Sequence, residues 1–138
     1  MTVLDFEKAM NGRALSPFIK WVGGKRQLLP SLVSYLPESY NHYYEPFVGG
    51  GALFLRLAPK VASINDFNEE LTNTWQVVKN NLDGLKQTLQ VHQANDSKEY
   101  YLNIRSADRD ERLVKMTNTQ RAARFIYLNK AGYNGLWR

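Results

Sequence analysis

The sequence predicts an α/β fold in which a small parallel sheet is followed by a region made of helices. Two short apolar segments have the length of strands, and a helical segment lies between them. Glycine clusters at 18–25 and 44–54 supply the turns of this first part. Beyond Phe67 the apolar residues recur at helical spacing only. Two strands are too few for a complete sheet, so we expect the chain to be the amino-terminal part of a larger protein.

The first half is predicted to contain a helix and then two strands that a second helix connects. Three leucines recur every four residues and predict the first helix, namely Leu28, Leu32 and Leu36. We expect an arm at 1–15, helices at 26–36 and 52–58, a buried strand at 43–47 and a second strand at 61–65. Pro46 ends the first strand, and Pro59 stops the second helix. Asp66 then lies at the carboxyl end of the second strand, where open α/β sheets place their ligands.

The second half is predicted to be helical. Four successive segments each contain apolar residues placed for one face of a helix. These residues are Leu71, Trp75, Val78 and Leu82; Leu82, Leu85 and Leu89; Tyr100, Tyr101 and Ile104; and Ala122, Phe125 and Ile126. Ser97 can cap the third of these helices. In the last helix, 119–129, we expect Arg121 and Arg124 to face outward, and the charged stretch 108–112 to be solvated.

The glycine clusters and Asp66 together form the pattern of a nucleoside-binding turn. Glycines let the backbone approach a ligand, and an acid after the second strand reaches ribose hydroxyls. The pattern is not a dinucleotide fingerprint, because Phe54 occupies the third glycine position. It is not a P-loop either, because Ile19 stands at the first glycine position and Arg26 follows Lys25.

The charge of the expected ligand is indicated by Glu45, which directly precedes the second glycine turn. A carboxylate at this place repels a pyrophosphate but attracts a cation. S-adenosylmethionine carries a sulfonium and an ammonium and no phosphate, and Lys25 can bind its carboxylate. We therefore predict S-adenosylmethionine as the cofactor. The alternative is a glycine-rich turn without a ligand.

Composition and charge indicate a folded protein with a polyanionic partner. The 138 residues are 43% hydrophobic and include no cysteine, which excludes a disulfide scaffold and a Cys-built zinc site and fits the cytoplasm. The net charge of +5 is unevenly spread. Segments 8–37 and 112–138 hold five and six basic residues and no acids, whereas 38–111 holds seven bases and eleven acids. Two acid-free segments around an acidic middle indicate nucleic acid as the partner.

Four motifs in one order resemble those of the Dam-type DNA adenine methyltransferase family. They are Lys-Trp-x-Gly-Gly-Lys at 20–25, Glu-Pro-Phe-x-Gly-Gly-Gly at 45–51, Ile-Asn-Asp at 64–66 and Tyr-Leu-Asn-Lys-Ala-Gly-Tyr-Asn-Gly-Leu-Trp-Arg at 127–138. The resemblance implies a partial Rossmann-like S-adenosylmethionine methyltransferase sheet over 16–67. A helical target-recognition insertion, incomplete here, would follow over 68–138. The implied enzyme methylates the exocyclic amino group of adenine in duplex DNA at a GATC-like site, alone or within a restriction-modification system.

The resemblance also implies a set of cofactor-binding residues. They are Trp21, Lys25, Glu45, Phe47, Gly49, Gly51 and Asp66. Each has a plainer alternative: core packing for Trp21, a solvated lysine for Lys25, and an acceptor that orients a neighbour for Glu45. For Asp66 the alternative is an ordinary cap of the following helix.

The DNA-binding residues implied by the resemblance are Lys20, Tyr133, Asn134, Leu136 and Arg138. An arginine at 138 can read guanine with two hydrogen bonds, and a leucine at 136 can meet a thymine methyl group. Tyr133 offers a ring to insert beside a flipped base, and Asn134 an amide for the orphaned partner base. Loop packing and a tight turn are the alternatives for these two residues. Lys20 is either a phosphate contact or a neighbour of the recognition surface.

The family's catalytic Asp/Asn-Pro-Pro-aromatic loop does not occur in these 138 residues, since none of the five prolines follows another proline, Asp or Asn. We therefore assign no catalytic residue and expect the chain alone to be inactive. Its expected partners are duplex DNA and a carboxyl-terminal part of the same protein, with no membrane. A non-catalytic remnant that binds cofactor or DNA is one alternative, and a nicotinamide-dependent oxidoreductase is another. Two isolated histidines make a metal site unexpected.

Overall fold

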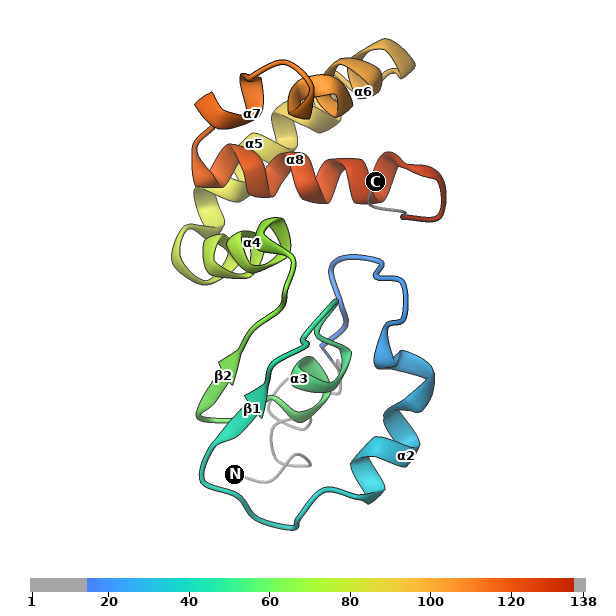
Figure 1. Ribbon diagram of the computed structural model, residues 1–138, viewed down its shortest axis with the longest axis vertical. Helices are drawn as coiled ribbons and strands as arrows, with labels where there is room; N and C mark the ends of the chain where they lie inside the picture. The colour runs from blue at the N-terminus through green and yellow to red at the C-terminus, as the bar shows by residue number, and fades with distance from the viewer. Residues whose placement is uncertain (1–14, 136–138) are drawn as a thin grey trace. The chain divides into compact units, whose positions relative to one another are not determined.

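A computed structural model of the chain describes residues 15–135 and, within them, every side chain except that of Asn134. The chain divides into two compact units, with the boundary between Asp66 and Phe67. The described part is mostly helical and contains one two-stranded parallel sheet (Figure 1). Each unit is described separately below.

The sheet of the first unit pairs β1 (Tyr43–Glu45) with β2 (Ala62–Ile64) in parallel. Tyr43 lies opposite Ala62, and Glu45 lies opposite Ile64. Backbone bonds extend the pairing at both ends, from Tyr43 N to Val61 O at 3.0 Å and from Asn65 N to Glu45 O at 2.9 Å. The strands are joined by α3 (Ala52–Leu57), so the unit is a strand–helix–strand crossover (Figure 1).

The helix between the strands begins and ends at left-handed residues. Gly51 precedes α3 with φ 76°, and Ala58 follows it with φ 43°. The residue before a proline is disfavoured in the right-handed helical region, which explains why α3 ends just before Ala58-Pro59. Both predicted strands are therefore present but shorter than expected. The first strand is also less buried than predicted, since Tyr44 is 70% exposed.

The predicted helix at 26–36 is present, but it is made of two pieces. A 3-10 turn, Lys25–Leu28, leads into α2 (Leu29–Ser34), and a proline occupies the first turn of α2. This proline has no N–H to donate, so the helix restarts there without losing a hydrogen bond. As a result the first leucine of the buried stripe is Leu29 and not Leu28. Leu29, Leu32 and Leu36 pack against the core of Tyr43, Leu53 and Leu57, whereas Leu28 is 58% exposed.

The second unit contains the predicted helices. They are α4 (Glu69–Asn80), α5 (Leu82–Ala94), α6 (Lys98–Arg105), the 3-10 turn Ser106–Asp108, α7 (Arg112–Lys115), α8 (Asn118–Ala131) and the 3-10 turn Tyr133–Gly135. Polar caps explain where the longer helices begin. Asn68, Asn81, Ser97 and Thr117 each accept a hydrogen bond from a backbone N–H in the first turn of the helix that follows.

Helix α8 is the centre of this unit, and eight consecutive residues in it are buried, from Ala122 to Asn129. It packs against α4, α5 and α6. The expectation that Arg124 faces outward is wrong, because Arg124 is 2% exposed. Arg121 is half-buried and forms an ion pair with Glu70 of α4, so it is not a solvated residue either. The stretch 122–129 of α8 has no solvent face because helices cover it on several sides, and residue spacing alone does not reveal this.

None of the helices described in residues 15–135 combines the length and the apolar character that a membrane span requires.

Candidate cofactor site

The candidate site lies at the carboxyl ends of β1 and β2, where two backbone segments are fastened together. Val48 N donates to Asn65 O at 2.9 Å. Gly49 N donates to Asp66 Oδ2, also at 2.9 Å. The glycine turn after β1 is thus bonded directly to the acid after β2, as expected from the meeting of parallel strand ends at one sheet edge.

The conformation of the turn explains its glycines. Gly49 has φ 53° and Gly51 has φ 76°, which are left-handed values that side chains disfavour. A Cβ on Gly49 would lie 2.9 Å from Cδ1 of Trp21. The indole of the first motif therefore lies directly against the glycine turn, and a larger residue at position 49 would displace one or the other.

A buried carboxylate joins the first motif to the end of β1. Glu45 is 5% exposed, and its Oε1 accepts a hydrogen bond from Lys25 Nζ at 2.7 Å. Its Oε2 accepts from the hydroxyl of Tyr43 at 2.7 Å. Lys25 Nζ also donates to the carbonyl oxygen of Phe47. Lys25 therefore connects Glu45, the last residue of β1, with Phe47, which precedes the glycines of the turn. The negative charge of Glu45 is compensated within the protein.

Tyr43 acts as a permanent donor in this cluster. Burial raises the pKa of the Tyr43 hydroxyl far above its usual range, and the hydrogen bond to Glu45 raises it further. The hydroxyl therefore keeps its proton and holds Oε2 of Glu45 in place. Sequence reasoning missed Tyr43, although residues two apart on a strand share a face, and Tyr43 and Glu45 are two apart.

The helix-cap alternative for Asp66 does not hold. The cap of α4 is Asn68, whose Oδ1 accepts from Leu71 N at 3.0 Å. The carboxylate of Asp66 instead bonds the glycine turn. Its role toward a ligand stays a prediction, but the competing structural explanation is removed.

The seven predicted cofactor residues all lie in the first unit, but they differ in how far they are exposed to solvent. Trp21 and Lys25 are half-buried, Glu45 is buried, and Phe47 is 71% exposed. The outward ring of Phe47 and the half-buried carboxylate of Asp66 are surfaces that a nucleoside can meet. No group of three or more His, Cys, Asp or Glu suited to a metal ion occurs among the described residues.

The predicted DNA-binding residues are only partly described. Lys20 is exposed in the first unit. Tyr133 is 84% exposed in the second unit, in the turn after α8. Asn134 belongs to the same turn by its backbone, while Leu136 and Arg138 lie outside the described residues.

Comparison with known sequences gives a consistent result. A sequence model of the family described as D12 class N6 adenine-specific DNA methyltransferase matches residues 21–138. The chain is 55% identical over 124 residues to the type II methyltransferase M1.LlaDCHI of Lactococcus lactis subsp. cremoris. It is 36% identical over 140 residues to the type II methyltransferase M.MjaIII of Methanocaldococcus jannaschii. It is also 36% identical over 126 residues to the DNA adenine methylase of Haemophilus influenzae.

These alignments cover most of this chain but less than half of each relative. They include 90%, 90% and 88% of the chain, and 44%, 48% and 42% of the respective relatives. The chain therefore corresponds to less than half the length of the relatives it matches.

Proposed function

Because the chain belongs to the D12 class N6 adenine-specific DNA methyltransferase family, we propose that it provides the cofactor site and part of the target-recognition region of such an enzyme. The proposed reaction transfers a methyl group to the exocyclic amino group of adenine in duplex DNA, at a site resembling GATC. The observation that carries this proposal is the bond from Gly49 N to Asp66 Oδ2. This hydrogen bond joins the glycine turn of the motif at 45–51 to the acid of the motif at 64–66, at one edge of the sheet.

The residues at this edge fit S-adenosylmethionine as the cofactor, which supplies an activated methyl group when bound. Gly49 and Gly51 adopt left-handed conformations that other residues disfavour, which lets the backbone turn tightly at this edge. Asp66 is the proposed acceptor for the ribose hydroxyls. Trp21 and Phe47 offer rings near the turn, and neither phosphate-binding fingerprint is present.

Lys25 and Glu45 have linked roles in this proposal. Lys25 donates to Glu45 and to the carbonyl of Phe47, and its ammonium has three N–H donors. We propose that Lys25 also attracts the cofactor's carboxylate. Glu45 then acts by holding Lys25, which is the orienting role that the sequence left open for it, and Tyr43 holds Glu45.

On the DNA side, the proposal assigns base contacts to the turn after α8 and to the residues that follow it. Arg138 is the proposed reader of guanine, Leu136 the neighbour of a thymine methyl group, and Asn134 the partner of the orphaned base. Tyr133 has the exposure that a base-stacking ring needs, at 84%. Lys20 is proposed to contact DNA from the first unit.

The cofactor site is tested by titrating the chain with S-adenosylmethionine and, separately, with NAD in a calorimeter. We expect binding of the first ligand only. Asp66→Ala is expected to weaken binding about tenfold or more, because a hydrogen bond to a charged group is lost. Asp83→Ala removes an exposed acid of α5 and is the matched control. Binding of NAD without S-adenosylmethionine would favour an oxidoreductase and overturn the proposal.

We also propose that these 138 residues alone do not methylate DNA, because they include no Asp/Asn-Pro-Pro-aromatic sequence to bind the target amino group. The test compares the chain with a chimera that continues it with the remaining carboxyl-terminal part of the Lactococcus relative. Methyl transfer to a GATC duplex is expected from the chimera only. Turnover by the chain alone contradicts the requirement for that loop.

A further inference from the structure

The turn that carries Tyr133 is attached to α8 by a buried amide. Asn129 is 1% exposed and lies in the last turns of α8. Its Nδ2 donates to the carbonyl oxygen of Gly135 at 3.0 Å. We propose that Asn129 is a positioning residue for DNA recognition, which fixes Tyr133 by closing this turn onto the helix. The inference rests on the proposed function, in which Tyr133 meets the DNA.

The backbone after α8 runs so close to the helix end that only glycine fits at 132. A Cβ on Gly132 would lie 2.6 Å from the carbonyl oxygen of Leu128 and 3.2 Å from the hydroxyl of Tyr101. The φ of Gly132 is an ordinary −75°, so space rather than conformation requires the glycine. Gly132 N donates to Leu128 O at 2.9 Å. One end of the turn is therefore held by the helix backbone.

The other end of the turn is held by Asn129. Gly135 is buried, has φ 66°, and presents its carbonyl to the amide of Asn129. The backbone bond within the turn, from Gly135 N to Gly132 O, is long at 3.4 Å and contributes little. The side-chain bond of Asn129 is thus the shorter connection that closes the turn.

This closure leaves one aromatic ring pointing into water. Tyr133 is 84% exposed between two anchored glycines. A tyrosine ring gives a large contact area at a low cost in conformational entropy, and it can stack on a base. A ring whose backbone is already fixed loses less conformational freedom when DNA binds, so the contact is stronger. The buried stretch of α8 that ends at Asn129 provides the rigid support.

The first test measures the turn without DNA. In Asn129→Ala, amide hydrogen exchange of the segment 132–135 is expected to become about tenfold faster, as for the loss of one hydrogen bond. Asn118→Ala is the matched control, since Asn118 is an exposed asparagine at the start of the same helix. Unchanged exchange in Asn129→Ala overturns the inference, whatever the chain does with DNA.

The second test measures DNA discrimination by fluorescence anisotropy, as the ratio of the Kd for a scrambled duplex to the Kd for a GATC duplex. Tyr133→Ala and Asn129→Ala are each expected to lower this ratio about tenfold, because the proposed contact of Tyr133 beside the flipped base forms only at the target site. If Asn129 acts through Tyr133, the double variant is no worse than Tyr133→Ala alone, whereas an independent or merely structural effect multiplies.

The outcomes separate the two proposals. If the unaltered chain does not distinguish the duplexes, the proposed function fails and the inference fails with it. If it does distinguish them and the two losses multiply, the proposed function stands and the positioning role fails. Should Asn129→Ala not fold, Gly132→Ala displaces the same turn by its clash with Leu128 O and leaves Asn129 in place. It is expected to lower the ratio in the same way, and an unchanged ratio contradicts the inference.

Discussion

At the scale of single residues, the buried polar groups of the helical unit carry the clearest consequences. His92 of α5 is 8% exposed and its ring stacks on Tyr127 with centroids 5.0 Å apart. Its Nδ1 lies 2.8 Å from the hydroxyl of Tyr100, while its Nε2 is buried without a hydrogen-bond partner. Tyr127 in turn donates to Asp96 at 2.6 Å. The site suits a neutral imidazole, and burial lowers the pKa of His92 below its usual 6.5.

This arrangement predicts a loss of stability in mild acid. Between the lowered pKa of His92 in the folded chain and 6.5 in the unfolded chain, the unfolded state binds more protons. Stability is therefore fully present above 6.5 and falls as the pH drops toward the folded-state pKa. We expect the melting temperature, followed by circular dichroism, to decrease from about pH 7 to about pH 5. His92→Phe should remove most of this decrease.

The control for this prediction is the other histidine. His42 lies in the first unit, where its Nε2 is 3.0 Å from Ser63 Oγ. His42→Gln should keep the decrease in melting temperature with acid. An equal flattening in both variants, or none in His92→Phe, contradicts the assignment to His92.

How far single residues can be predicted from sequence depends on whether their partners are near in sequence. Ser97 was predicted as a cap because its partner, Tyr100 N, is three residues away. Glu45 was recognised as unusual, but its compensation by Lys25 joins residues 20 positions apart. Contacts of this range are set by the fold, and spacing rules do not contain them.

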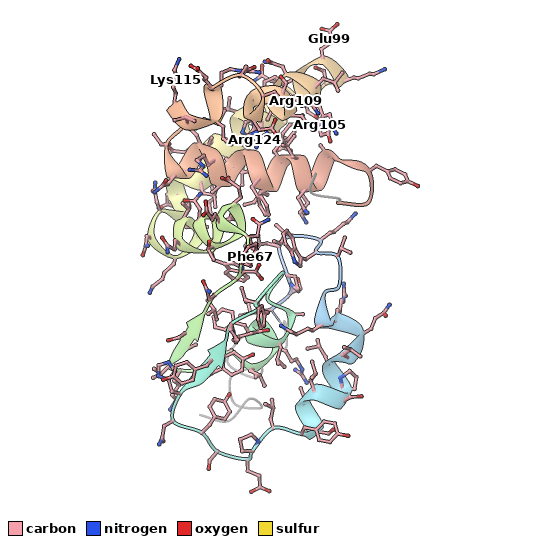
Figure 2. All side chains as sticks on the ribbon, in the orientation of Figure 1. Phe67, Glu99, Arg105, Arg109, Lys115 and Arg124 are labelled. Carbon is pink, nitrogen blue, oxygen red and sulfur yellow. The ribbon has the colours of Figure 1, made fainter. Side chains whose placement is uncertain are left out.

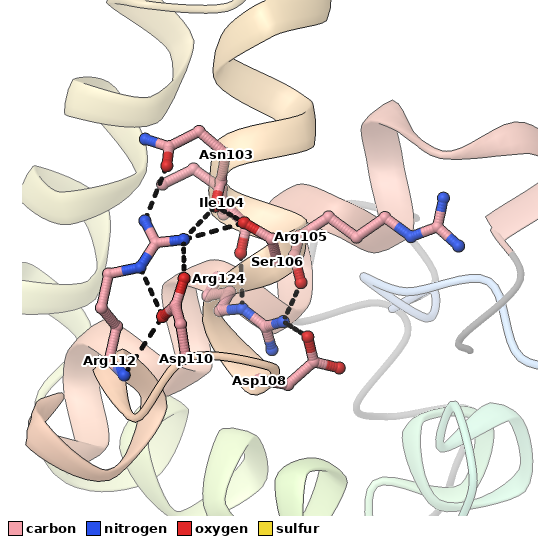
Figure 3. Close-up of polar contacts among 8 residues, drawn as sticks. All are labelled: Asn103, Ile104, Arg105, Ser106, Asp108, Asp110, Arg112 and Arg124. Atoms are coloured by element: carbon pink, nitrogen blue, oxygen red, sulfur yellow. Dashed lines mark hydrogen bonds and ion pairs between the residues drawn. The ribbon is translucent and has the colours of Figure 1, made fainter.

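At the scale of elements, the carboxyl end of α6 shows how one helix completes another. Arg124 of α8 donates from Nε to Ile104 O at 2.9 Å and from Nη2 to Arg105 O at 2.8 Å (Figure 3). These carbonyls belong to the last turn of α6, where helix carbonyls lack partners within the helix. Nη2 also lies 3.6 Å from Asp108. Burial lowers the pKa of the Arg124 guanidinium, and the negative charge of Asp108 partly offsets this lowering. The carbonyls of Ile104 and Arg105 hold the guanidinium in place.

A second arginine supports the same helix end. Arg112 donates to Asn103 Oδ1 at 2.7 Å, to Asn103 O at 3.0 Å and to Ser106 Oγ at 2.8 Å. It also pairs with Asp110, and this bond lowers the pKa of the Asp110 carboxyl. The side chain of Arg105 points away from this cluster (Figure 3). The stretch 108–112, which was predicted to be solvated, thus contains Arg112, and this residue connects α7 to α6.

The capping role of Arg124 predicts a large effect of a single substitution. Arg124→Met keeps much of the volume but removes the buried guanidinium and its two hydrogen bonds to the carbonyls of Ile104 and Arg105, and should lower the free energy of unfolding by about 2–4 kcal/mol. Arg109→Met alters an exposed arginine of the same region and should change it by less than about 0.5 kcal/mol. Urea denaturation of both variants measures the difference. Equal stability of the two would mean that Arg124 is not needed to satisfy the end of α6.

Elements themselves were predicted well where a periodic stripe and a cap agree. The last helix was expected at 119–129 and is found at Asn118–Ala131, with a capping box of Thr117 and Gln120. Strand lengths were predicted less well, because β1 and β2 are bounded by turn geometry rather than by the ends of their apolar segments. The replacement of Leu28 by Leu29 in the buried stripe has a similar origin, since the proline of α2 sets where the helix starts.

At the scale of the whole chain, the count of charges overstates the surface that DNA can meet. The segment 112–138 holds six basic residues and no acids. Yet Arg112 and Arg121 are paired with Asp110 and Glu70, and Arg124 is buried. The hydrogen bond to Glu70 raises the pKa of Arg121. The acids that compensate these arginines, Asp110 and Glu70, belong to the acidic segment 38–111. The charges of this segment and of the basic segment 112–138 therefore largely neutralise each other inside the helical unit.

Two lysines of this segment remain available to phosphates. Lys115 and Lys130 are exposed, and neither has an ion-pair partner among the residues that the structure describes. Lys115 projects from α7 at the edge of the helical unit (Figure 2). Within this segment, these two lysines should therefore contribute to the salt dependence of DNA binding, whereas Arg112, Arg121 and Arg124 should not. Each phosphate contact contributes about −0.9 to the slope of log K against log salt.

This expectation is tested by measuring Kd for a DNA duplex over a range of salt concentrations. Lys115→Gln and Lys130→Gln should each reduce the magnitude of the slope by about 0.9, because each removes one released counterion. Lys79→Gln removes an exposed lysine of α4, within the acidic middle segment, and should leave the slope unchanged. If all three substitutions change the slope equally, DNA responds only to net charge. The internal pairing of the arginines would then have no bearing on where the phosphates bind.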